Sequence, residues 1–408
     1  MDDTLTRYEL PTQWVQYRPL EILTELVEAK AAVMALTTMP FQRSWAEALQ
    51  EMELKREVAG TSKIEGAEFT DREFEEAVSE KTPEGALTRS QRQARAAIHT
   101  YRWIASHPTD LPVDAALVCN IHRRIVTGCD DDHCAPGELR EDGHNVTFGR
   151  PRHRGAEGGD ECQRAFGRLF GAVNQEFRAH DPLIQALAVH YHLGALHPFQ
   201  DGNGRTARAL EAMFLRKAGL KDALFISMSN YYYDEKDNYL NTLHVATDRN
   251  HDLTPFLKFG LHGIATQCNR LLREIKRHVA RSMFREVMAT MYGRLKSTRK
   301  RALAIRQLSI LEKLLELDDE TNLQDFYNAI QLNYQNLKST GKAFVRDINF
   351  LSHMGAIRIT KQDQLPGRHV WSTYVLSARL EWPTEITETA FYRQINALPQ
   401  AKTRVLVG

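Results

Sequence analysis

Apolar residues recur every three or four positions along most of the chain, which predicts a mainly helical protein. The first amphipathic helix is predicted over 19–39, before Pro40, and the second over 42–58, where Gly60 is expected to interrupt it. Residues 1–18 lack this pattern, so we expect an irregular lead-in. Further helices are predicted over 71–79, from Arg89 to His107, and from about 112 to 125.

Two helices are predicted to meet in the middle of the chain. Asp181 offers an N-cap and Pro182 suits the first helical position, and apolar residues keep helical spacing until just before His197. A second helix is predicted over 205–217, where Ala, Leu, Met and Phe return at helical spacing. The twelve residues 197–208 should therefore form the joint between the two helices.

A long loop is predicted over 128–160, because many glycines and two prolines break the helical pattern there. Long insertions without regular structure are usually functional, so we expect this loop to serve a site. One short run inside it is prone to form a β-strand, namely Asn145, Val146, Thr147 and Phe148.

Two groups of residues suggest metal ligands but have simpler interpretations. Cys129, His133 and Cys134 flank three aspartates, and the usual behaviour of a charge run favours a solvated acidic loop over a metal site. His190 and His192 lie two positions apart, so they cannot share one helix face. We therefore do not expect a joint metal site with His197.

The C-terminal third changes character. One long helix is predicted over 255–292, and the stretch 270–306 holds twelve Lys and Arg against two Glu, a net +10. Such a run is usually a solvated face, although it could approach DNA or an acidic partner. Past it we predict helices over 308–317, 325–331 and 340–354, strands over 357–360 and 370–376, and a turn at 365–367.

Composition places the chain among ordinary globular proteins. Its 408 residues suggest two or three domains, and 42% hydrophobic with 26% charged residues provide an ample core. The formal charge of +1 predicts no partner, and five cysteines without paired metal spacing suit a reducing cytoplasm. We expect no signal peptide and no membrane span, because the first residues are acidic and no run of about 18 apolar residues occurs.

The central joint concentrates groups that bind phosphate. Gly202 and Gly204 permit backbone angles that leave amides free at the start of the second helix, where the helix dipole attracts an anion. Arg205 and Arg208 lie three apart on that helix, and each can place a forked guanidinium on phosphate oxygens. A Walker-type ATP site is excluded, because no Gly-Lys-Ser/Thr run occurs.

Two further side chains supply chemistry. His197 titrates near neutrality and can take a proton from an attacking hydroxyl. Asp201 offers a hard oxygen ligand for Mg²⁺, which usually binds through one or two carboxylates and the phosphates of the substrate. Each residue alone is compatible with a glycine-rich helix connection, but the whole set favours a phosphate site with a catalytic base.

The run from His197 to Arg208 resembles the signature of the Fic family, His-x-Phe-x-Asp/Glu-Gly-Asn-Gly-Arg-x-x-Arg, at every fixed position. In that family the histidine deprotonates a protein hydroxyl that attacks the α-phosphate of ATP, which leaves AMP on the target. The resemblance implies that His197 is the base and that Asp201 holds Mg²⁺. The implied nucleotide-binding residues in this run are Phe199, Gly202, Asn203, Gly204, Arg205 and Arg208.

Other segments resemble the same family. Tyr239 and Leu240 match, by spacing, the aromatic pair that the family places near adenine. Residues 136–140 resemble its Pro-Gly-x-x-Arg turn, and 121–125 the first helix of its core. The run 145–148 would then be the flap that pairs its backbone with the target protein.

A third motif lies ahead of the core. Thr61 and Glu65 are four apart, so they share one helix face, and Gly66 ends the turn. Alone this reads as a surface turn, but it resembles the inhibitory motif of the Fic family, Ser/Thr-x-x-x-Glu-Gly/Asn. Glu65 would form a bidentate pair with Arg208 and keep ATP in an unproductive pose.

The expected fold is mainly α, with a helical Fic core, a β-hairpin flap and a C-terminal α+β domain. Residues 339–351 resemble the recognition helix of winged-helix domains, with the turn at 365–367 as the wing, and such domains bind DNA or dock proteins. The expected divisions are an N-terminal inhibitory region at 1–110, a catalytic core at 111–265, a basic linker helix at 266–300, a winged helix at 301–380 and a tail at 381–408.

These expectations favour an autoinhibited protein adenylyltransferase in the cytoplasm that uses ATP and Mg²⁺ on exposed Ser, Thr or Tyr of target proteins. Three alternatives stay open: removal of AMP, transfer of another phosphate-linked group such as UMP or phosphocholine, and a DNA-binding regulator whose core only senses nucleotide. Analogy with the family also suggests a homodimer.

Overall fold

The computed structural model describes residues 5–39, 43–67, 70–79, 81–108, 112–130, 133–149, 151–220, 226–293, 298–317, 320–362 and 370–379. The chain forms two compact units, residues 1–273 and 274–408, and the division falls within the long helix α11 (Thr254–Gly293). The predicted tail at 381–408 lies outside the described residues. The model is mainly helical with a few short strands, so the predicted fold class is confirmed.

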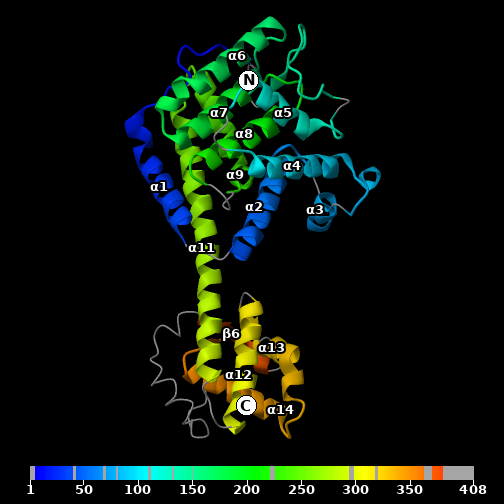
Figure 1. Cartoon of the computed structure of the whole chain (residues 1–408), viewed down its shortest axis with the longest axis vertical. Coiled ribbons are helices and arrows are strands. Elements are labelled where there is room, and N and C mark those ends of the chain that lie inside the picture. Colours follow the sequence, from blue (N-terminus) through cyan, green and yellow to red (C-terminus); the bar gives the residue numbers. More distant parts are fainter. Residues whose placement is uncertain are drawn as a thin grey trace. The chain divides into compact units, whose positions relative to one another are not determined.

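The core of the first unit is the helix pair α7 (Pro182–Leu196) and α8 (Asn203–Lys217), which Figure 1 shows in its middle. The side chain of Asp181 caps α7 by accepting the amide of Leu183 at 3.0 Å, as predicted. Almost every side chain of both helices is buried. The helices around this pair are α4 (Arg89–Ser106), α5 (Ala115–Val126), α6 (Asp160–Asn174), α9 (Met228–Asp234) and α10 (Lys236–Asp248).

Helix α2 (Arg43–Ile64) runs straight through Gly60, so the predicted interruption is wrong. A Cβ at this glycine would lie 2.5 Å from the backbone nitrogen of Asn230 in α9. The glycine therefore serves close helix packing rather than a break. Because α2 continues, it brings Thr61 and the residues after Ile64 up to the core.

The N-terminal segment is more ordered than its sequence suggests. Residues Thr6–Arg7 form strand β1, so the expectation of a wholly irregular lead-in is wrong. Helix α1 then covers Pro19–Thr38, close to its predicted bounds. The short elements that follow α2 are α3 (Asp71–Val78) and a 3₁₀ turn (Glu84–Ala86), and a second 3₁₀ turn (Glu176–Ala179) precedes α7.

The predicted flap is a small β-hairpin. Strand β2 (Thr147–Phe148) pairs antiparallel with β3 (His153–Arg154), with Phe148 opposite His153. Strand β1 adds to the other side of β3 in parallel, so the sheet order is β1-β3-β2. The outer edge of β2 therefore has no strand beside it among the described residues.

The second unit has its own core. After α12 (Thr298–Glu316) come β4 (Thr321–Asn322), α13 (Leu323–Ile330), a 3₁₀ turn (Gln331–Tyr334), α14 (Thr340–His353), β5 (Ile357–Lys361), a further 3₁₀ turn (Val370–Thr373) and β6 (Tyr374–Ala378). The sheet order is β4-β6-β5, with both pairs antiparallel. The hydrophobic core between its helices includes the fully buried Leu311, Phe326 and Ile348. The winged-helix assignment stays a prediction.

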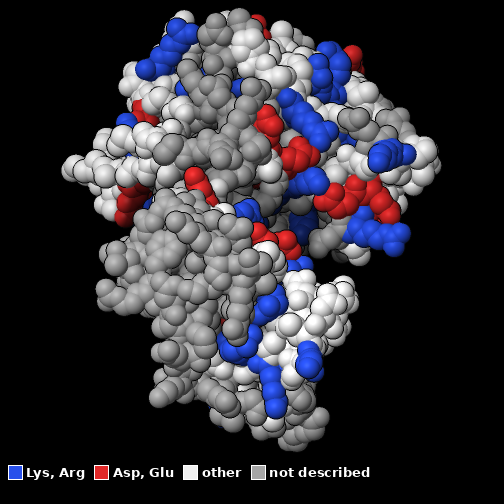
Figure 2. All heavy atoms as spheres, turned by 60° about the horizontal axis from the view of Figure 1, so that its bottom comes forward, with Lys and Arg blue, Asp and Glu red and all other residues white. Residues whose placement is uncertain are grey.

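Two details of this unit differ from the sequence-based expectation or lie beyond it. The last strand begins at Tyr374 rather than Val370, because 370–373 form the 3₁₀ turn. The predicted wing turn at 365–367 lies outside the described residues. Among the charged described residues on the visible face of this unit, Figure 2 shows mainly Lys and Arg. A basic face suits DNA or an acidic protein, and such a contact stays a prediction.

Among the described residues, no helix combines the length and apolar character that crossing a bilayer requires.

Candidate active site

A cavity of about 430 Å³ opens beside the joint of α7 and α8. It brings together residues from α2, the flap, α7, α8 and α10, which lie far apart in the sequence. The candidate site residues that line it are Glu65, Phe148, His197, Asp201, Gly202, Asn203, Gly204, Arg208, Tyr239 and Leu240. Phe199 and Arg205 do not line this cavity.

His197 ends α7 in a left-handed conformation with φ 52° and ψ 58°, which a non-glycine residue adopts only when its surroundings impose it. Its Nδ1 lies 2.9 Å from the carbonyl oxygen of Gly194, so Nδ1 carries the proton and donates. In the neutral ring this leaves the lone pair on Nε2. Burial lowers the pKa of His197 to about 4, so the ring is neutral at pH 7 and can accept a proton.

The flap covers this histidine. The ring of Phe148 stacks on the imidazole with 3.8 Å between ring centroids and 10° between planes. Behind the flap, Nε of Arg140 donates to the carbonyl oxygen of His197 at 2.9 Å, and its guanidinium also binds the carbonyls of His144 and Ala156. The buried Arg140 therefore ties the flap loop to the catalytic turn.

The turn after His197 is held by side chain to backbone hydrogen bonds. The side chain of Asn203 accepts the amide of Phe199 at 2.9 Å and donates to its carbonyl at 2.8 Å. Both ends of this side-chain amide thus help to shape the loop, with one N–H and one lone pair used. Phe199 is buried and stacks on His122 at 3.8 Å between centroids, so it supports the turn from behind.

His122 fastens the same turn from α5. Its Nδ1 accepts the amide of Gly137 at 2.9 Å, so Nε2 is the nitrogen that donates to the carbonyl of Asp201, at 3.0 Å. Gly202 is left-handed with φ 74°, and a Cβ there would lie 2.8 Å from Val126. Both the backbone angle and the close approach of α5 thus require glycine at this position.

The start of α8 offers an anion site. The first amides of a helix have no partner within the helix, and the dipole makes this end positive. A Cβ at Gly204 would lie 2.6 Å from Oε1 of Glu65 and 3.1 Å from the guanidinium of Arg208. The absence of a side chain at Gly204 therefore lets an acidic group approach this first turn closely.

Asp201 is suited to hold a cation. One carboxylate oxygen, Oδ1, accepts the amide of Gly202 at 2.6 Å, which orients the group. The other, Oδ2, belongs to a side chain that is 41% exposed, and it lies 3.6 Å from the guanidinium of Arg205. The guanidinium of Arg89 lies 3.9 Å from the same oxygen. Asp201 lines the cavity, and a carboxylate oxygen there is the ligand type that Mg²⁺ prefers, with water and phosphate oxygens completing its shell.

Arg205 is anchored by a buried acid that the sequence analysis misjudged. Its guanidinium lies 2.7 Å from Oδ2 of Asp130, and the other oxygen of Asp130 accepts Arg89 at 2.7 Å and Gln93 at 2.8 Å. Asp130 is fully buried, so the expectation of a solvated acidic loop is wrong at this position. Burial opposes ionisation, but the charge of Arg205 holds the pKa of Asp130 below its usual value.

Arg208 meets both residues of the motif on α2. Its Nε donates to Oγ1 of Thr61 at 2.8 Å, and its terminal nitrogen forms an ion pair with Glu65. The predicted bidentate pair is therefore wrong in detail, because the second donor goes to the threonine. Burial would raise the pKa of Glu65, but the charge of Arg208 outweighs it and holds that pKa low.

The end of α2 is fixed next to this ion pair. Gly66 adopts a left-handed φ of 86° and closes the helix, as predicted. Nζ of Lys236 donates to the carbonyl of Ile64 at 2.9 Å, which binds the end of α2 to α10. Two helical turns before Ile64 in α2, the buried Glu57 accepts the hydroxyl of Tyr101 at 2.9 Å.

The predicted adenine pair lies on α10 at the cavity. Leu240 is 39% exposed, whereas Tyr239 is buried and its hydroxyl lies 2.9 Å from Nε2 of His190. The other nitrogen of His190 binds Glu211, so this histidine belongs to a buried network and not to a metal site with His197.

The remaining flap residues shape the loop. The side chain of Asn145 accepts the amide of Gly158 at 3.2 Å, and the carbonyl of Val146 accepts the amide of Gly155 at 3.3 Å. Thr147 is exposed. Of the four flap residues, Phe148 is therefore the one that reaches the cavity.

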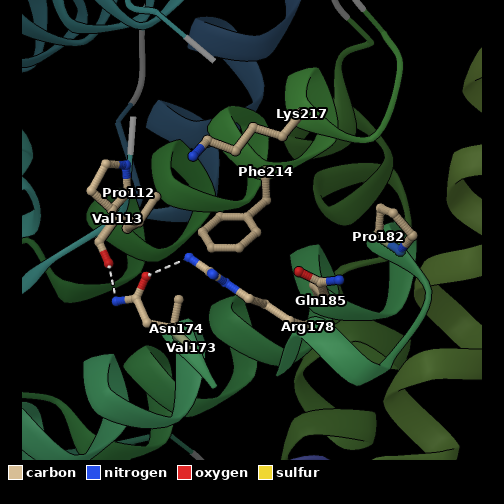
Figure 3. Close-up of a pocket in the computed structure, with 9 residues that line it drawn as sticks. All are labelled: Pro112, Val113, Val173, Asn174, Arg178, Pro182, Gln185, Phe214 and Lys217. Carbon is tan, nitrogen blue, oxygen red and sulfur yellow. Dashed lines mark hydrogen bonds between the residues drawn. The ribbon is translucent and has the colours of Figure 1, made fainter. Parts of the chain in front are cut away.

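A second cavity, of about 390 Å³, lies on the first unit and is lined by none of these candidate site residues. Figure 3 shows Asn174 on one wall, where it donates to the carbonyl of Val113 at 3.0 Å and accepts Arg178 at 3.4 Å. The cavity beside His197 alone joins a neutral imidazole, an exposed carboxylate and a buried arginine within the described structure, so it is the candidate active site.

The segment that contains α7 and α8 matches a known protein family. Residues 112–215 match the model of the Fic/DOC family. The protein adenylyltransferase fic-1 of Caenorhabditis briggsae is 36% identical over 81 residues, which is 20% of this chain and 14% of that protein. The protein adenylyltransferase Fic of Nematostella vectensis is 39% identical over 79 residues, 19% of this chain and 16% of that protein. The chain thus spans a small part of these curated relatives.

Solved structures share the fold. A Fic family protein of Desulfovibrio desulfuricans aligns with a TM-score of 0.53 at 18% identity, over 91% of this chain and 98% of that one. A Fic-1 structure from Caenorhabditis elegans aligns with a TM-score of 0.52 at 19% identity, over 63% of this chain and 74% of that one. The chain therefore contains a Fic domain at residues 112–215.

Proposed function

We propose that this chain is a protein adenylyltransferase that moves AMP from ATP to a Ser, Thr or Tyr hydroxyl of a target protein, and that Glu65 holds it inactive. The observation that carries the proposal is the single cavity shared by His197, the first turn of α8 and Arg208. The curated relatives named as protein adenylyltransferases match 19–20% of the chain, which supports the same activity.

In the proposed reaction, Nε2 of His197 takes the proton of the target hydroxyl. The hydroxyl oxygen attacks the α-phosphorus of ATP, the bond to the bridging oxygen of the β-phosphate breaks, and pyrophosphate leaves. Because Nδ1 is held by Gly194, the ring presents a lone pair and needs no rearrangement before it accepts the proton.

The phosphates would be bound by groups already in place. The first amides of α8 and the helix dipole stabilise negative charge at the α-phosphate, and the guanidinium of Arg208 suits the outer phosphates. Arg205, held by Asp130, adds positive charge behind the first turn. Asp201 would hold Mg²⁺, which neutralises phosphate charge when bound. Tyr239 and Leu240 would form the wall against adenine.

The flap would present the target. Strand β2 is an edge strand of the sheet β1-β3-β2, so its free edge is able to pair with an extended segment of another protein. The stacking of Phe148 on His197 places this edge directly beside the base. A hydroxyl side chain on a paired segment would then reach Nε2.

Inhibition would act through Arg208. In the described structure this guanidinium is engaged by Glu65 and Thr61, so it has fewer donors for the outer phosphates. The carboxylate also lies over Gly204, where phosphate charge would be repelled. ATP would then bind with its α-phosphate poorly placed for attack.

The test compares two labels on ATP. The Glu65→Gly chain is incubated with Mg²⁺, a cell lysate as the source of targets, and ATP labelled in either the α- or the γ-phosphate. Kinases of the lysate transfer γ-label whichever variant is present, so each label is compared between Glu65→Gly and Glu65→Gly with His197→Ala. Adenylyl transfer predicts that the double variant loses the α-label and gives the same γ-label. γ-Label that falls with the loss of His197, or α-label that survives it, would overturn the proposal. Stronger protein label from α-labelled UTP than from α-labelled ATP would favour transfer of UMP.

A further inference from the structure

A cluster of potential metal ligands lies at the edge of the active-site cavity. His153 comes from flap strand β3, and His244 and Asp248 lie four apart on α10, so the last two share one helix face. One ligand atom from each residue lies within 4.8 Å of the other two. It is the one group of three such residues found among the described parts of the chain. Nothing in the adenylyl transfer proposed above uses it.

His244 stands between the other two ligands. Nε2 of His153 faces Nδ1 of His244 at 2.8 Å, and Nε2 of His244 lies 3.2 Å from Oδ2 of Asp248, so His244 meets its neighbours through different ring nitrogens. One ion needs only one nitrogen of His244, and one ligand atom from each of the three residues lies within 4.8 Å of the other two. Ligands about 2.0–2.1 Å from a tetrahedral ion stand roughly 3.3 Å apart, so a rotation of the His244 ring would bring the three ligand atoms onto a common centre.

The residue types select the class of ion. Two imidazoles and one carboxylate form the ligand set of zinc-type sites, whereas Mg²⁺ prefers oxygen ligands alone. The side chain of Asp248 is 44% exposed and that of His244 is 20% exposed, so an ion has a path from solvent and room for water as a fourth ligand.

A neighbouring group supports the carboxylate. The hydroxyl of Thr6 in β1 donates to Oδ1 of Asp248 at 3.4 Å, and Oδ1 is not the oxygen that faces His244. Such outer hydrogen bonds commonly orient metal ligands. Because β1 and β2 both pair with β3, the cluster connects the whole flap sheet to α10.

We propose that His153, His244 and Asp248 bind one Zn²⁺-class ion that fastens the flap to α10. The ion would hold β3 in place, and with it the paired strand β2 whose Phe148 covers His197. It is distinct from the Mg²⁺ expected at Asp201, and it does not depend on the adenylyltransferase activity.

Binding is measured on the full chain after removal of any histidine tag. Co²⁺ serves as the first probe, because tetrahedral cobalt absorbs visible light, and calorimetry with Zn²⁺ follows. We expect one equivalent of metal, with affinity at least tenfold weaker in His244→Ala and in Asp248→Asn. The matched control is His99→Ala, which removes an exposed histidine of α4 and should leave binding unchanged. Asp248→Asn keeps the test decisive if His244→Ala fails to fold, because this carboxylate is at the surface.

A second measurement locates the effect. Hydrogen exchange at residues 145–156 should slow when Zn²⁺ is added to the parent chain, and should not change in Asp248→Asn. Absence of one-to-one binding, equal affinity in all variants, or unchanged exchange in the flap at saturating Zn²⁺ would each overturn the proposal.

Discussion

The carboxylate of Glu65 lies over Gly204, so closely that a Cβ at 204 would come within 2.6 Å of Oε1. This contact joins the end of α2 to the first turn of α8, where the positive helix end and Arg208 attract an acidic group. The same place suits a phosphate. The proposed inhibition follows from this competition between a carboxylate of the chain and the phosphates of ATP.

Thr61→Val should weaken the inhibition without removing it. The change deletes the hydroxyl that accepts Nε of Arg208 at 2.8 Å and keeps the side-chain volume. A hydrogen bond to a charged group contributes about 1.5–3 kcal/mol. We expect a water molecule to replace part of this interaction with Arg208, so the rate of AMP transfer should rise roughly fivefold to tenfold. Initial rates of label incorporation measure it, and an unchanged rate would show that Glu65 alone positions the arginine.

Gly60→Ala should destabilise the packing of α2 on α9. A Cβ there would lie 2.5 Å from the backbone of Asn230, which cannot move aside as a flexible side chain would. Overpacking of this kind costs about 1–3 kcal/mol in the free energy of unfolding, measured by urea denaturation. Gly171→Ala is the matched control, because its Cβ would meet open space and alanine favours the helix α6 by up to about 1 kcal/mol. Equal effects of the two variants would contradict this account of Gly60.

Asp130→Asn should be strongly destabilising. The change removes the charge that pairs with Arg205, whose side chain is only 6% exposed. Loss of one partner from a buried ion pair costs about 3–5 kcal/mol, because the other charge stays buried. Glu141→Gln, at an exposed acid of the same loop, should change the free energy of unfolding by less than about 0.5 kcal/mol. A small effect of Asp130→Asn would restore the interpretation of a solvated acidic loop.

AMP transfer should be lost on acidification only at a pH well below 6.5, the usual pKa of histidine. Burial lowers the pKa of His197 from 6.5 to about 4, so the basic form persists as pH falls and is lost only near that value. The charge of Glu65 raises the pKa of His197. Its removal in the active Glu65→Gly chain should therefore lower that pKa further, and activity should be lost at a still lower pH. Rates of AMP transfer are measured from pH 7.5 to 4.5, with circular dichroism at each pH to confirm folding. A midpoint at 6.5 or above would contradict the buried, neutral base.

Local sequence patterns were sufficient for the centre of the site. The helices on either side of His197, the glycine turn and the pairing of Glu65 with Arg208 all follow from spacing within short segments or from a motif. The helices and the glycine turn depend on neighbours in the sequence, so the sequence carries them directly. Glu65 and Arg208 lie 143 positions apart, and their pairing was predicted only from the resemblance to the inhibitory motif of the Fic family.

Features that depend on distant partners could not be predicted in this way. The sequence favoured a helix break at Gly60 because the glycine comes close to Asn230 only after α2 packs on α9. Asp130 was predicted to be solvated because its partner Arg205 lies 75 positions away in the sequence. Strand β1 has two residues and no strand pattern of its own, and it forms because β3 offers an edge.

The most direct test of the central claim is the rate of AMP transfer from α-labelled ATP by the parent chain, Glu65→Gly, and Glu65→Gly with His197→Ala. If Glu65 restrains an active site whose base is His197, Glu65→Gly should exceed the parent by about tenfold to a hundredfold, as expected for removal of a charged hydrogen bond of 1.5–3 kcal/mol, and the double variant should show no transfer. Equal or lower incorporation in Glu65→Gly, or transfer that persists without His197, would contradict the account.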